Sequence, residues 1–512
     1  MLPQVGASKQ LRPSAAAERR FPIWAIVAVL ASCGTFVSLQ QTLIIPMLVD
    51  LPKIFNTTPA NTSWLVTATL LTSAIAMPVI SRLADMYGKR QMLLLCVVLI
   101  TVGSVIGALF TSLPLVILAR SLQGFSTAMI PVGISIMRDE LPKERVVSAV
   151  ALMSATLGIG GAIGLPLGGV LYSKFGYHSI FWLSAIVGAL MFVLILVVVS
   201  ESLIKTPAKF DVVGSVIISV ALLCVLLAVS QGSSWGWGSA RVLGLFAGFV
   251  VLMIVWVPLE LRTSAPLIDL RTSARKPVLL TNLATVLVGF SMFAQMLAVI
   301  QLLTLPTSTG YGFGLSPVQA GLTLLPGGAL MVILAPVSAK ITNRFGARTT
   351  LFVGAMVMAA GYVALVFSLG NLITIIIAGA AVNAGIALAY AAMPTLIMDA
   401  VPITETASAN GLNALLRSVG TSSSSASVAA IMSAMSVGAG TLLVPTLGAF
   451  QTIFVISAVS AVGGALFAML LPRRESSPDS FDPGAQYDTE HARHERAMHD
   501  GGVAAGLVAA KS

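Results

Sequence analysis

One short polar stretch, residues 81–90, gathers the side chains with the clearest chemical potential. It reads Ser-Arg-Leu-Ala-Asp-Met-Tyr-Gly-Lys-Arg and carries one carboxylate among three cations, with a glycine that permits a tight turn. A carboxylate at the end of a helix can pair with a cation or accept hydrogen bonds from the N-terminus of another helix. We predict that the stretch is a conformational latch between two helical bundles, the alternative being an ordinary cation-rich loop. The residues of the predicted latch are Arg82, Asp85, Gly88, Lys89 and Arg90.

The same pattern returns at residues 339–348, which read Ala-Lys-Ile-Thr-Asn-Arg-Phe-Gly-Ala-Arg. A basic residue, an aliphatic residue, Asp or Asn, an aromatic–glycine pair and a final Arg match in register. Each stretch follows the second long apolar segment of a six-segment block. Weak internal symmetry between six-helix halves is typical of secondary transporters, so this echo favours the latch interpretation.

Two arginines lie inside long apolar segments, where a charge is expensive and marks a functional site by default. Arg120 lies in the segment 114–136, and Gln123 follows it one helical turn later on the same face. For Arg120 the alternative is packing against backbone carbonyls at a helix end. Arg417 lies near the start of the segment 406–434, close enough to the membrane interface for its side chain to snorkel.

The segment 147–171 carries glycines at intervals of four residues, which leave one helix face as bare backbone. A neighbouring helix can approach such a face closely. A proline in the same segment loosens the local hydrogen bonding and permits a bend. Simple tight packing is the alternative role for this face. Its residues are Gly160, Gly164, Pro166, Gly168 and Gly169.

Fourteen apolar segments, each long enough to cross a bilayer, hold these side chains. A hydrocarbon core of about 30 Å needs roughly 20 apolar residues per helix. Of the 512 residues, 57% are hydrophobic and 9% are charged, whereas a soluble domain is about 25% charged. The predicted spans are 23–49, 64–81, 91–110, 114–136, 147–171, 180–199, 212–230, 241–259, 278–305, 317–338, 349–368, 372–397, 406–434 and 450–471.

The distribution of the net charge of +10 indicates membrane topology rather than nucleic-acid binding. If the N-terminus is cytoplasmic and the spans alternate, 24 of the 29 Lys and Arg residues fall on the cytoplasmic side. This is the positive-inside bias of membrane proteins. We therefore expect a multi-pass protein of the plasma membrane with both termini in the cytoplasm.

Two polar breaks, 200–211 and 260–277, isolate a two-helix hairpin at 212–259 between two six-helix blocks. The composition of the last 41 residues, rich in charge and poor in apolar side chains, favours disorder. We predict a cytoplasmic tail at 1–22, an N-terminal six-helix bundle at 23–200, a linker with the inserted hairpin at 201–277, a C-terminal six-helix bundle at 278–471 and a disordered cytoplasmic tail at 472–512.

The stretch 81–90 resembles the loop signature of the major facilitator superfamily, Gly-x-Leu-Ala-Asp-x-x-Gly-Arg-Lys, with Ser81 in place of the leading glycine. Fourteen spans with an inserted hairpin resemble the drug:proton antiporter branch of that family. The resemblance covers roughly residues 21–471. It implies an all-α membrane protein with the major facilitator fold, two six-helix bundles plus an inserted two-helix hairpin. Further matching stretches are Leu118–Gly124, Phe210–Gly214, the Trp-Gly-Trp turn at 235–237, Pro266–Leu270 and Gly411–Arg417.

The resemblance implies roles in proton handling or gating for Arg120 with Gln123, and a seal against leak for the glycine-rich segment. This chain departs from the branch in the first span, where Gln40 stands at the usual position of an Asp. An amide cannot bind and release a proton as a carboxylate does. None of the 19 Asp and Glu residues lies deep in a predicted span. Titratable carboxyls remain near helix ends at Asp85, Asp139, Glu140, Asp399 and Glu405.

Without a buried acid, a strongly cationic drug would lack a counter-charge, so neutral, zwitterionic or weakly acidic amphipathic substrates fit better. We expect a cavity with an apolar, amide-rich lining. For each amide the alternative is a hydrogen bond between helices. The candidate lining residues are Gln40, Gln41, Asn282, Gln295, Asn383, Asn413 and Arg417.

Together these patterns predict a monomeric secondary transporter that exports hydrophobic or amphipathic small molecules by alternating access. We expect this transport to be proton-linked, although Gln40 replaces the usual Asp of the first span. The alternative is an uncoupled facilitator or exporter of one endogenous metabolite or lipid. The sequence offers no intramembrane carboxylate pair, Ser/His pair or Cys/His cluster, and its three cysteines lie in apolar spans. We therefore expect no enzyme activity, cofactor, metal or nucleic-acid partner; the expected partners are the substrate and the lipid bilayer.

Overall fold

Inside a bilayer an apolar segment finds no water for its backbone, so it closes its hydrogen bonds within itself as a helix. The computed structural model describes residues 21–47, 50–202, 204–439 and 442–472, and most of these residues lie in such helices. The expected all-helical membrane fold is confirmed there, with one short pair of strands added. The tails predicted at 1–22 and 472–512 lie almost entirely outside the described residues.

The first predicted block forms six long helical segments, of which the fourth is interrupted by a 3-10 turn. Short helices connect the first two segments. The elements are α1 (Ile23–Thr42), η1 (Ile45–Met47), α2 (Leu51–Ile54), α3 (Pro59–Thr62), α4 (Trp64–Tyr87), α5 (Lys89–Leu109), α6 (Leu113–Gly124), η2 (Phe125–Ala128), α7 (Met129–Glu140), α8 (Lys143–Phe175) and α9 (His178–Val198).

The inserted hairpin consists of α10 (Val212–Trp235) and α11 (Ala240–Arg262), which begin at side-chain caps from Asp211 and Ser239. Such caps satisfy amides that have no partner within the helix. The second block follows it. Its elements are α12 (Leu270–Ser273), α13 (Lys276–Thr304), η3 (Thr307–Thr309), α14 (Pro317–Leu322), α15 (Leu325–Phe345), α16 (Ala347–Phe367), α17 (Leu372–Ala400), η4 (Ile403–Glu405), α18 (Thr406–Ala434), β1 (Ser436–Ala439), β2 (Leu442–Pro445) and α19 (Leu447–Leu470).

Among the described residues, 13 helices are long and apolar enough to cross a membrane, and each coincides with a predicted span. The remaining predicted span, 406–434, forms α18 with the expected bounds but is more polar. Because α18 packs against α4, α7, α10, α13 and α17, neighbouring helices rather than lipid surround much of it. Polar side chains can therefore find partners in other helices there.

Each six-helix block has its own apolar core. One large cluster joins buried residues of α13 to α19, such as Val288, Leu351 and Phe454. The other joins mainly α1 to α9, through residues such as Leu30 and Leu93. All helices up to Leu471 nevertheless belong to one compact unit, and the domain boundaries given above stay a prediction.

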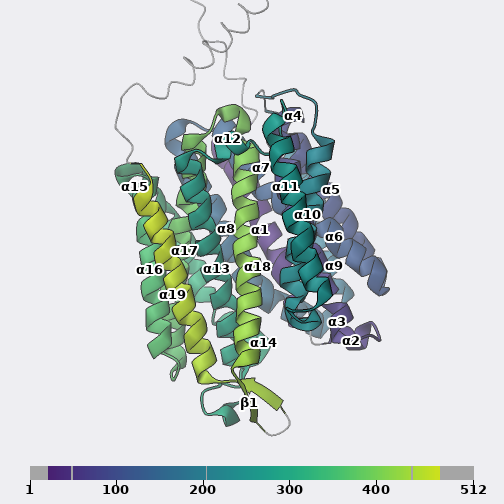
Figure 1. Cartoon of the computed structure of the whole chain (residues 1–512), viewed down its shortest axis with the longest axis vertical. Helices are drawn as coiled ribbons and strands as arrows, with labels where there is room; N and C mark the ends of the chain where they lie inside the picture. Colours follow the sequence, from purple (N-terminus) through teal and green to yellow (C-terminus); the bar gives the residue numbers. More distant parts are fainter. Residues whose placement is uncertain (1–20, 48–49, 203, 440–441, 473–512) are drawn as a thin grey trace, which may run out of the picture. The chain divides into compact units, whose positions relative to one another are not determined.

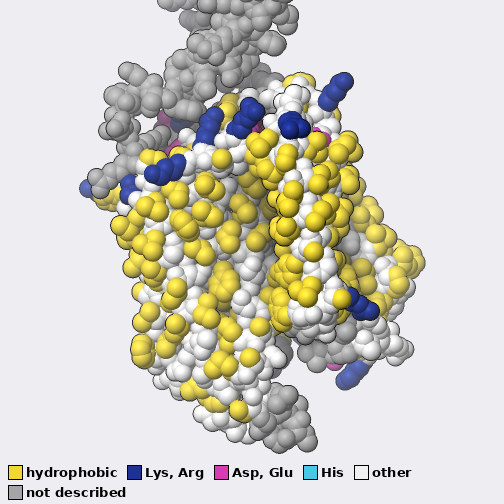
Figure 2. Space-filling view, viewed as in Figure 1, with side chains coloured by type: hydrophobic (Ala, Val, Ile, Leu, Met, Phe, Trp, Pro, Cys, Tyr) yellow, Lys and Arg dark blue, Asp and Glu magenta, His cyan; other side chains and the backbone are white. Residues whose placement is uncertain are grey.

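The two ends of the helical unit differ in charge. Figure 1 shows α12 at one end and the β1–β2 hairpin at the other. Lys and Arg side chains gather at the α12 end, while hydrophobic side chains cover most of the surface between the ends (Figure 2). We call the α12 end the basic end; it carries the exposed cations Arg262, Arg271, Arg275, Lys340 and Arg344.

The glycine face of α8 lies against the backbone of α1. A side chain at Gly160 would meet the carbonyl oxygen of Thr35 at 2.5 Å, and one at Gly168 would meet that of Leu43 at 2.3 Å. A different side of α8 faces the second block, because a side chain at Gly169 would lie 2.6 Å from Val318. Both contacts need residues without a Cβ, and α8 continues as a helix through Pro166.

Gly168→Ala is expected to destabilise the protein, because its methyl group has to displace the α1 backbone. Overpacking of this kind costs about 1–3 kcal/mol, and thermal unfolding of the purified protein measures the loss. Gly161→Ala is the matched control, since its methyl group would meet nothing nearer than Ser38 Oγ at 3.8 Å. Equal melting temperatures for the two variants would contradict close helix packing at Gly168.

Candidate functional site

Asp85 lies near the end of α4 with 1% of its surface exposed. Its Oδ1 accepts a hydrogen bond from the N–H of Ala407 at 3.2 Å, and its Oδ2 accepts from the N–H and the hydroxyl of Ser408, each at 2.7 Å. Both partners lie in the first turn of α18, where backbone amides have no acceptor within their own helix. The helix dipole favours a negative charge at this position. Asp85 therefore joins the first block to the second at the basic end.

A second polar contact between the blocks comes from Arg138 at the end of α7. Its guanidinium donates to the hydroxyl of Thr406 at 2.7 Å and to the carbonyl of Val401 at 3.2 Å. Thr406 opens α18 and Val401 follows α17. Arg138 therefore holds the turn between α17 and α18 beside Asp85.

The cations that follow Asp85 bind within the first block instead. Lys89 is buried, and its Nζ lies 2.6 Å from Oδ2 of Asp139 at the end of α7. The hydroxyl of Ser202, in the linker after α9, donates to the same oxygen. This ion pair fixes the start of α5 against α7 and leaves the Asp85 carboxylate to the amides of α18.

The echo between the two stretches is visible in three dimensions. Arg90 donates to the carbonyl of Leu196 in α9, and Arg348 donates in the same way to the carbonyl of Met469 in α19. The glycine of each stretch ends a helix with positive φ, +133° for Gly88 and +85° for the second, a region that glycine adopts at little cost. The counterpart of Asp85, Asn343, is exposed, so the equivalent carboxylate contact is not repeated.

Glu405 extends the charged group around Asp85. Burial raises the pKa of this carboxyl, and the negative charges of Asp269 and Asp85 act in the same direction. The positive charges of Arg82 and Arg275 oppose them. Arg82, the remaining cation of the predicted latch, thus acts on the residue that directly precedes α18.

Arg120 and Gln123 of α6 form one buried hydrogen-bond network with Gln40 of α1. The Oε1 of Gln123 accepts from Arg120 Nη1 at 2.9 Å and from Gln40 Nε2. Arg120 Nε also donates to the carbonyl of Leu65 at 3.2 Å, and Gln123 Nε2 donates to Ser104 at 2.9 Å. The amide at position 40 is therefore linked to Arg120 through a shared acceptor, and Gln40 Oε1 is buried without a hydrogen-bond partner.

Arg417 is half-buried in α18 and contacts an aromatic ring of α17. Its guanidinium carbon is 5.2 Å from the ring centroid of Tyr390 in α17, a cation–π contact. The carbonyl of Tyr390 accepts from Ser154 of α8 at 2.9 Å, so Arg417 stands close to the seam between the two blocks. Snorkelling, one expectation from the sequence, stays a prediction.

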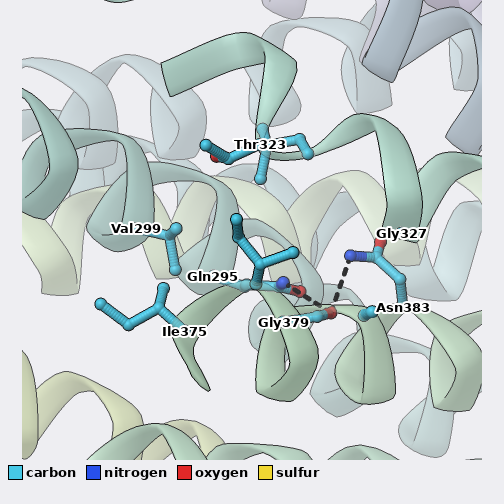
Figure 3. Close-up of a pocket in the computed structure, with 10 residues that line it drawn as sticks. Gln295, Val299, Thr323, Gly327, Ile375, Gly379 and Asn383 are labelled. Carbon is cyan, nitrogen blue, oxygen red and sulfur yellow. Dashed lines mark hydrogen bonds between the residues drawn. The ribbon is translucent and has the colours of Figure 1, made fainter. Parts of the chain in front are cut away.

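The other candidate lining residues divide into two groups. Asn413 donates to Asn282 at 2.9 Å and to Thr285 at 2.8 Å, which is a hydrogen bond between helices. Gln295 and Asn383 both donate to the carbonyl of Gly379 at 3.0 Å beside a cavity of about 10 Å³ (Figure 3).

That cavity has room for about one water molecule, whereas sites for drug-sized ligands occupy about 300–1,000 Å³. Gln41, in α1, is half-buried. The residues predicted to line a cavity are thus dispersed over α1, α13, α17 and α18, and their role in binding stays a prediction.

Sequence reasoning missed Arg138 and Ser408. From the sequence, Arg138 is only one of the 24 Lys and Arg residues expected on the cytoplasmic side. A signal for Ser408 was available, because a turn with Pro402 precedes the polar start of the segment 406–434, and amides at such a start need acceptors.

Comparison with known proteins defines the family. The family model described as Major Facilitator Superfamily matches residues 30–425. This chain belongs to the Major Facilitator Superfamily.

Two relatives of this chain are named for drug resistance. "Multidrug resistance protein Stp" of Mycobacterium tuberculosis is 28% identical over 414 residues, 80% of this chain and 76% of that protein. "Tetracenomycin C resistance and export protein" of Streptomyces glaucescens is 28% identical over 339 residues, 66% of this chain and 62% of that protein. Among solved structures, the human organic anion transporter MFSD10 has a TM-score of 0.62 at 13% identity, covering 88% of this chain and all of that one. This last likeness concerns the fold alone.

Gln123→Met is expected to destabilise this superfamily member, because it removes the shared acceptor of Gln40 and Arg120. A buried donor left without an acceptor costs about 1–3 kcal/mol, which thermal unfolding in detergent would detect. Gln41→Met, at a half-buried amide on α1, should change the melting temperature much less. If both variants melt like the wild type, the network contributes nothing to stability.

Proposed function

We propose that this protein is a secondary active transporter that exports hydrophobic or amphipathic small molecules across the plasma membrane by alternating access. Membership in the superfamily supports transport, and relatives named for multidrug resistance and for tetracenomycin C resistance and export favour the substrate class. The termini are proposed to lie in the cytoplasm, which places the basic end on that side.

The observation that carries the mechanism is the contact of Asp85 with the first turn of α18. Three hydrogen bonds join one block to the other there, and both sets of groups would be exposed if the blocks separated. Water can satisfy a carboxylate and helix amides once they are accessible. We therefore assign Asp85 as the latch that closes the basic end and opens when the blocks rock apart.

The charges of the interior support the proposed substrate chemistry. Arg120 donates to an amide and a carbonyl, and Arg417 lies over an aromatic ring. The buried Arg120 and the half-buried Arg417 are thus accommodated by neutral groups, and position 40 holds an amide. Such an interior suits neutral, zwitterionic or weakly acidic amphipathic molecules better than strongly cationic ones.

Proton linkage is part of the proposal, and one observation favours the alternative of an uncoupled facilitator. Gln40 joins the Arg120 network as an amide, a position where a carboxylate would pair with Arg120 and titrate. Whichever coupling applies, the same seam between the blocks serves transport.

Efflux from proteoliposomes with an imposed pH gradient separates the two possibilities. With a neutral fluorescent dye as the probe, proton-linked export predicts that the gradient accelerates efflux severalfold. Gln40→Asp is the companion variant. If wild-type efflux ignores the gradient and the Asp variant responds to it, transport by the natural protein is uncoupled.

Asp85→Asn is expected to leave the protein folded and inserted but to slow transport about tenfold or more, because a neutral amide interacts less favourably with the α18 dipole. Transport rate per inserted molecule is the measurement. Glu144→Gln, an exposed acid at the start of α8, is the control and should transport normally. Unchanged turnover of the Asp85 variant at equal abundance would remove the latch from the mechanism.

A further inference from the structure

Two carboxyl side chains meet at the foot of the inserted hairpin. Asp211 caps α10, with its Oδ1 accepting from the N–H of Gly214 at 2.8 Å. Glu260 lies in the last turn of α11 with 2% of its surface exposed, and its Oε1 accepts from the N–H of Ile268 at 2.7 Å. One oxygen of each carboxyl is therefore used by the backbone.

The other two oxygens converge. Asp211 Oδ2 and Glu260 Oε2 are both buried without a hydrogen-bond partner. Gly214 leaves the space that they share, since a Cβ at that residue would lie 2.1 Å from Asp211 Oδ2 and 2.8 Å from Glu260 Oε2. Both oxygens lie within 2.8 Å of that one position, so they face the same small space.

Two ionised carboxylates cannot satisfy one another, because both only accept. Two negative charges placed so close together also repel. A single proton on either carboxyl removes both problems: it supplies an O–H donor between the two orphaned oxygens and leaves one charge, as in other carboxyl pairs that share a proton. We propose that Asp211 and Glu260 form a proton-binding site in which the pair holds one proton.

The other charged groups near the pair bind other partners or are exposed. Asp211 is the charged residue whose free oxygen faces the free oxygen of Glu260. Asp269 accepts from the N–H groups of Arg271 and Thr272 at the start of α12, at 2.8 and 3.0 Å. The guanidinium of Arg271 donates to the carbonyl of Leu261 at 3.4 Å. Arg262 and Lys209, on either side of the pair, are exposed. None of these cations therefore lies between the two free oxygens, and the proton occupies that position.

The pair lies where its proton can influence the packing of the hairpin on the two blocks. Glu260 connects α11 to Ile268, in the segment that leads through α12 into the second block. The hairpin packs on α4 and α18, the two helices that Asp85 joins. The shared apolar cluster contains Leu222 and Trp256 of the hairpin, Met77 of α4 and Leu415 of α18.

With the proton bound, the foot of the hairpin is closed against these helices; without it, two like charges push Asp211 and Glu260 apart. The inserted hairpin thereby makes the seam between the blocks sensitive to pH at the basic end. This site goes beyond the transport proposal, and its test requires no transport.

The pH dependence of stability tests the proposal on the purified full-length protein. Because the folded pair binds its proton more tightly than the unfolded chain does, the contribution of the pair to stability is largest at low pH and is lost as pH rises through release of the proton. Between about pH 5.5 and about pH 8.5 the melting temperature of the wild type should fall by about 2–4 °C more than that of Glu260→Gln. The Gln amide donates to Asp211 at every pH and still accepts from Ile268.

Glu144→Gln, an exposed acid at the same end, should follow the wild type. Asp211→Asn gives the same comparison if Glu260→Gln does not fold, because its Oδ1 still caps Gly214. If the melting temperatures of the wild type and of the pair variants changed equally with pH, the proposal would be overturned.

Infrared difference spectroscopy supplies a second readout. The wild type and Glu144→Gln should lose one protonated-carboxyl band on alkaline titration, and both pair variants should lack that band. A band that persists in Glu260→Gln and Asp211→Asn would also overturn the proposal.

Discussion

The architecture depends on one buried carboxylate that is satisfied only by the opposite half of the molecule. Asp85 is 1% exposed and takes its hydrogen bonds from Ala407 and Ser408. A buried charge without partners is strongly unfavourable, and the first amides of α18 equally need an acceptor. The two blocks therefore complete each other at the basic end. Because water can replace both partners on opening, the contact is strong when closed and still reversible.

Around this contact the cations have separate tasks. Lys89 and Arg90 hold the first block together through Asp139 and the carbonyl of Leu196. Arg348 repeats the second contact in the other block, but the exposed Asn343 does not repeat the role of Asp85. The internal symmetry thus extends to the fixing of each loop and stops at the carboxylate. Polar contacts at one end only, from Asp85 and from Arg138, let that end open without breaking the packing within either block.

Much of the fold follows from the sequence, because long apolar runs have only one way to satisfy their backbone in lipid. The α8 glycines are predictable for a similar reason, since their spacing places them on one helix face. The residues that contact one another across the seam between the blocks are harder to predict from the sequence. No local sequence pattern around Ser408 or Arg138 identifies Asp85 or α18 as the partner. The approach of Glu260 to Asp211 is equally hidden, because it brings together residues on either side of a hairpin. Gln295 and Asn383 could equally line a cavity or bond a carbonyl, and the sequence contains nothing that decides between these roles.

The most direct test of the account is the distance between the two blocks at the basic end. Spin labels report this distance when they are attached at two exposed positions, one in each block, in a background without the three native cysteines. The positions are Tyr87, which is 47% exposed, and Lys340. The account predicts two distance populations in the wild type and a larger share of the longer one in Asp85→Asn. A single distance, the same in both proteins, would contradict the claim that Asp85 holds the two blocks closed.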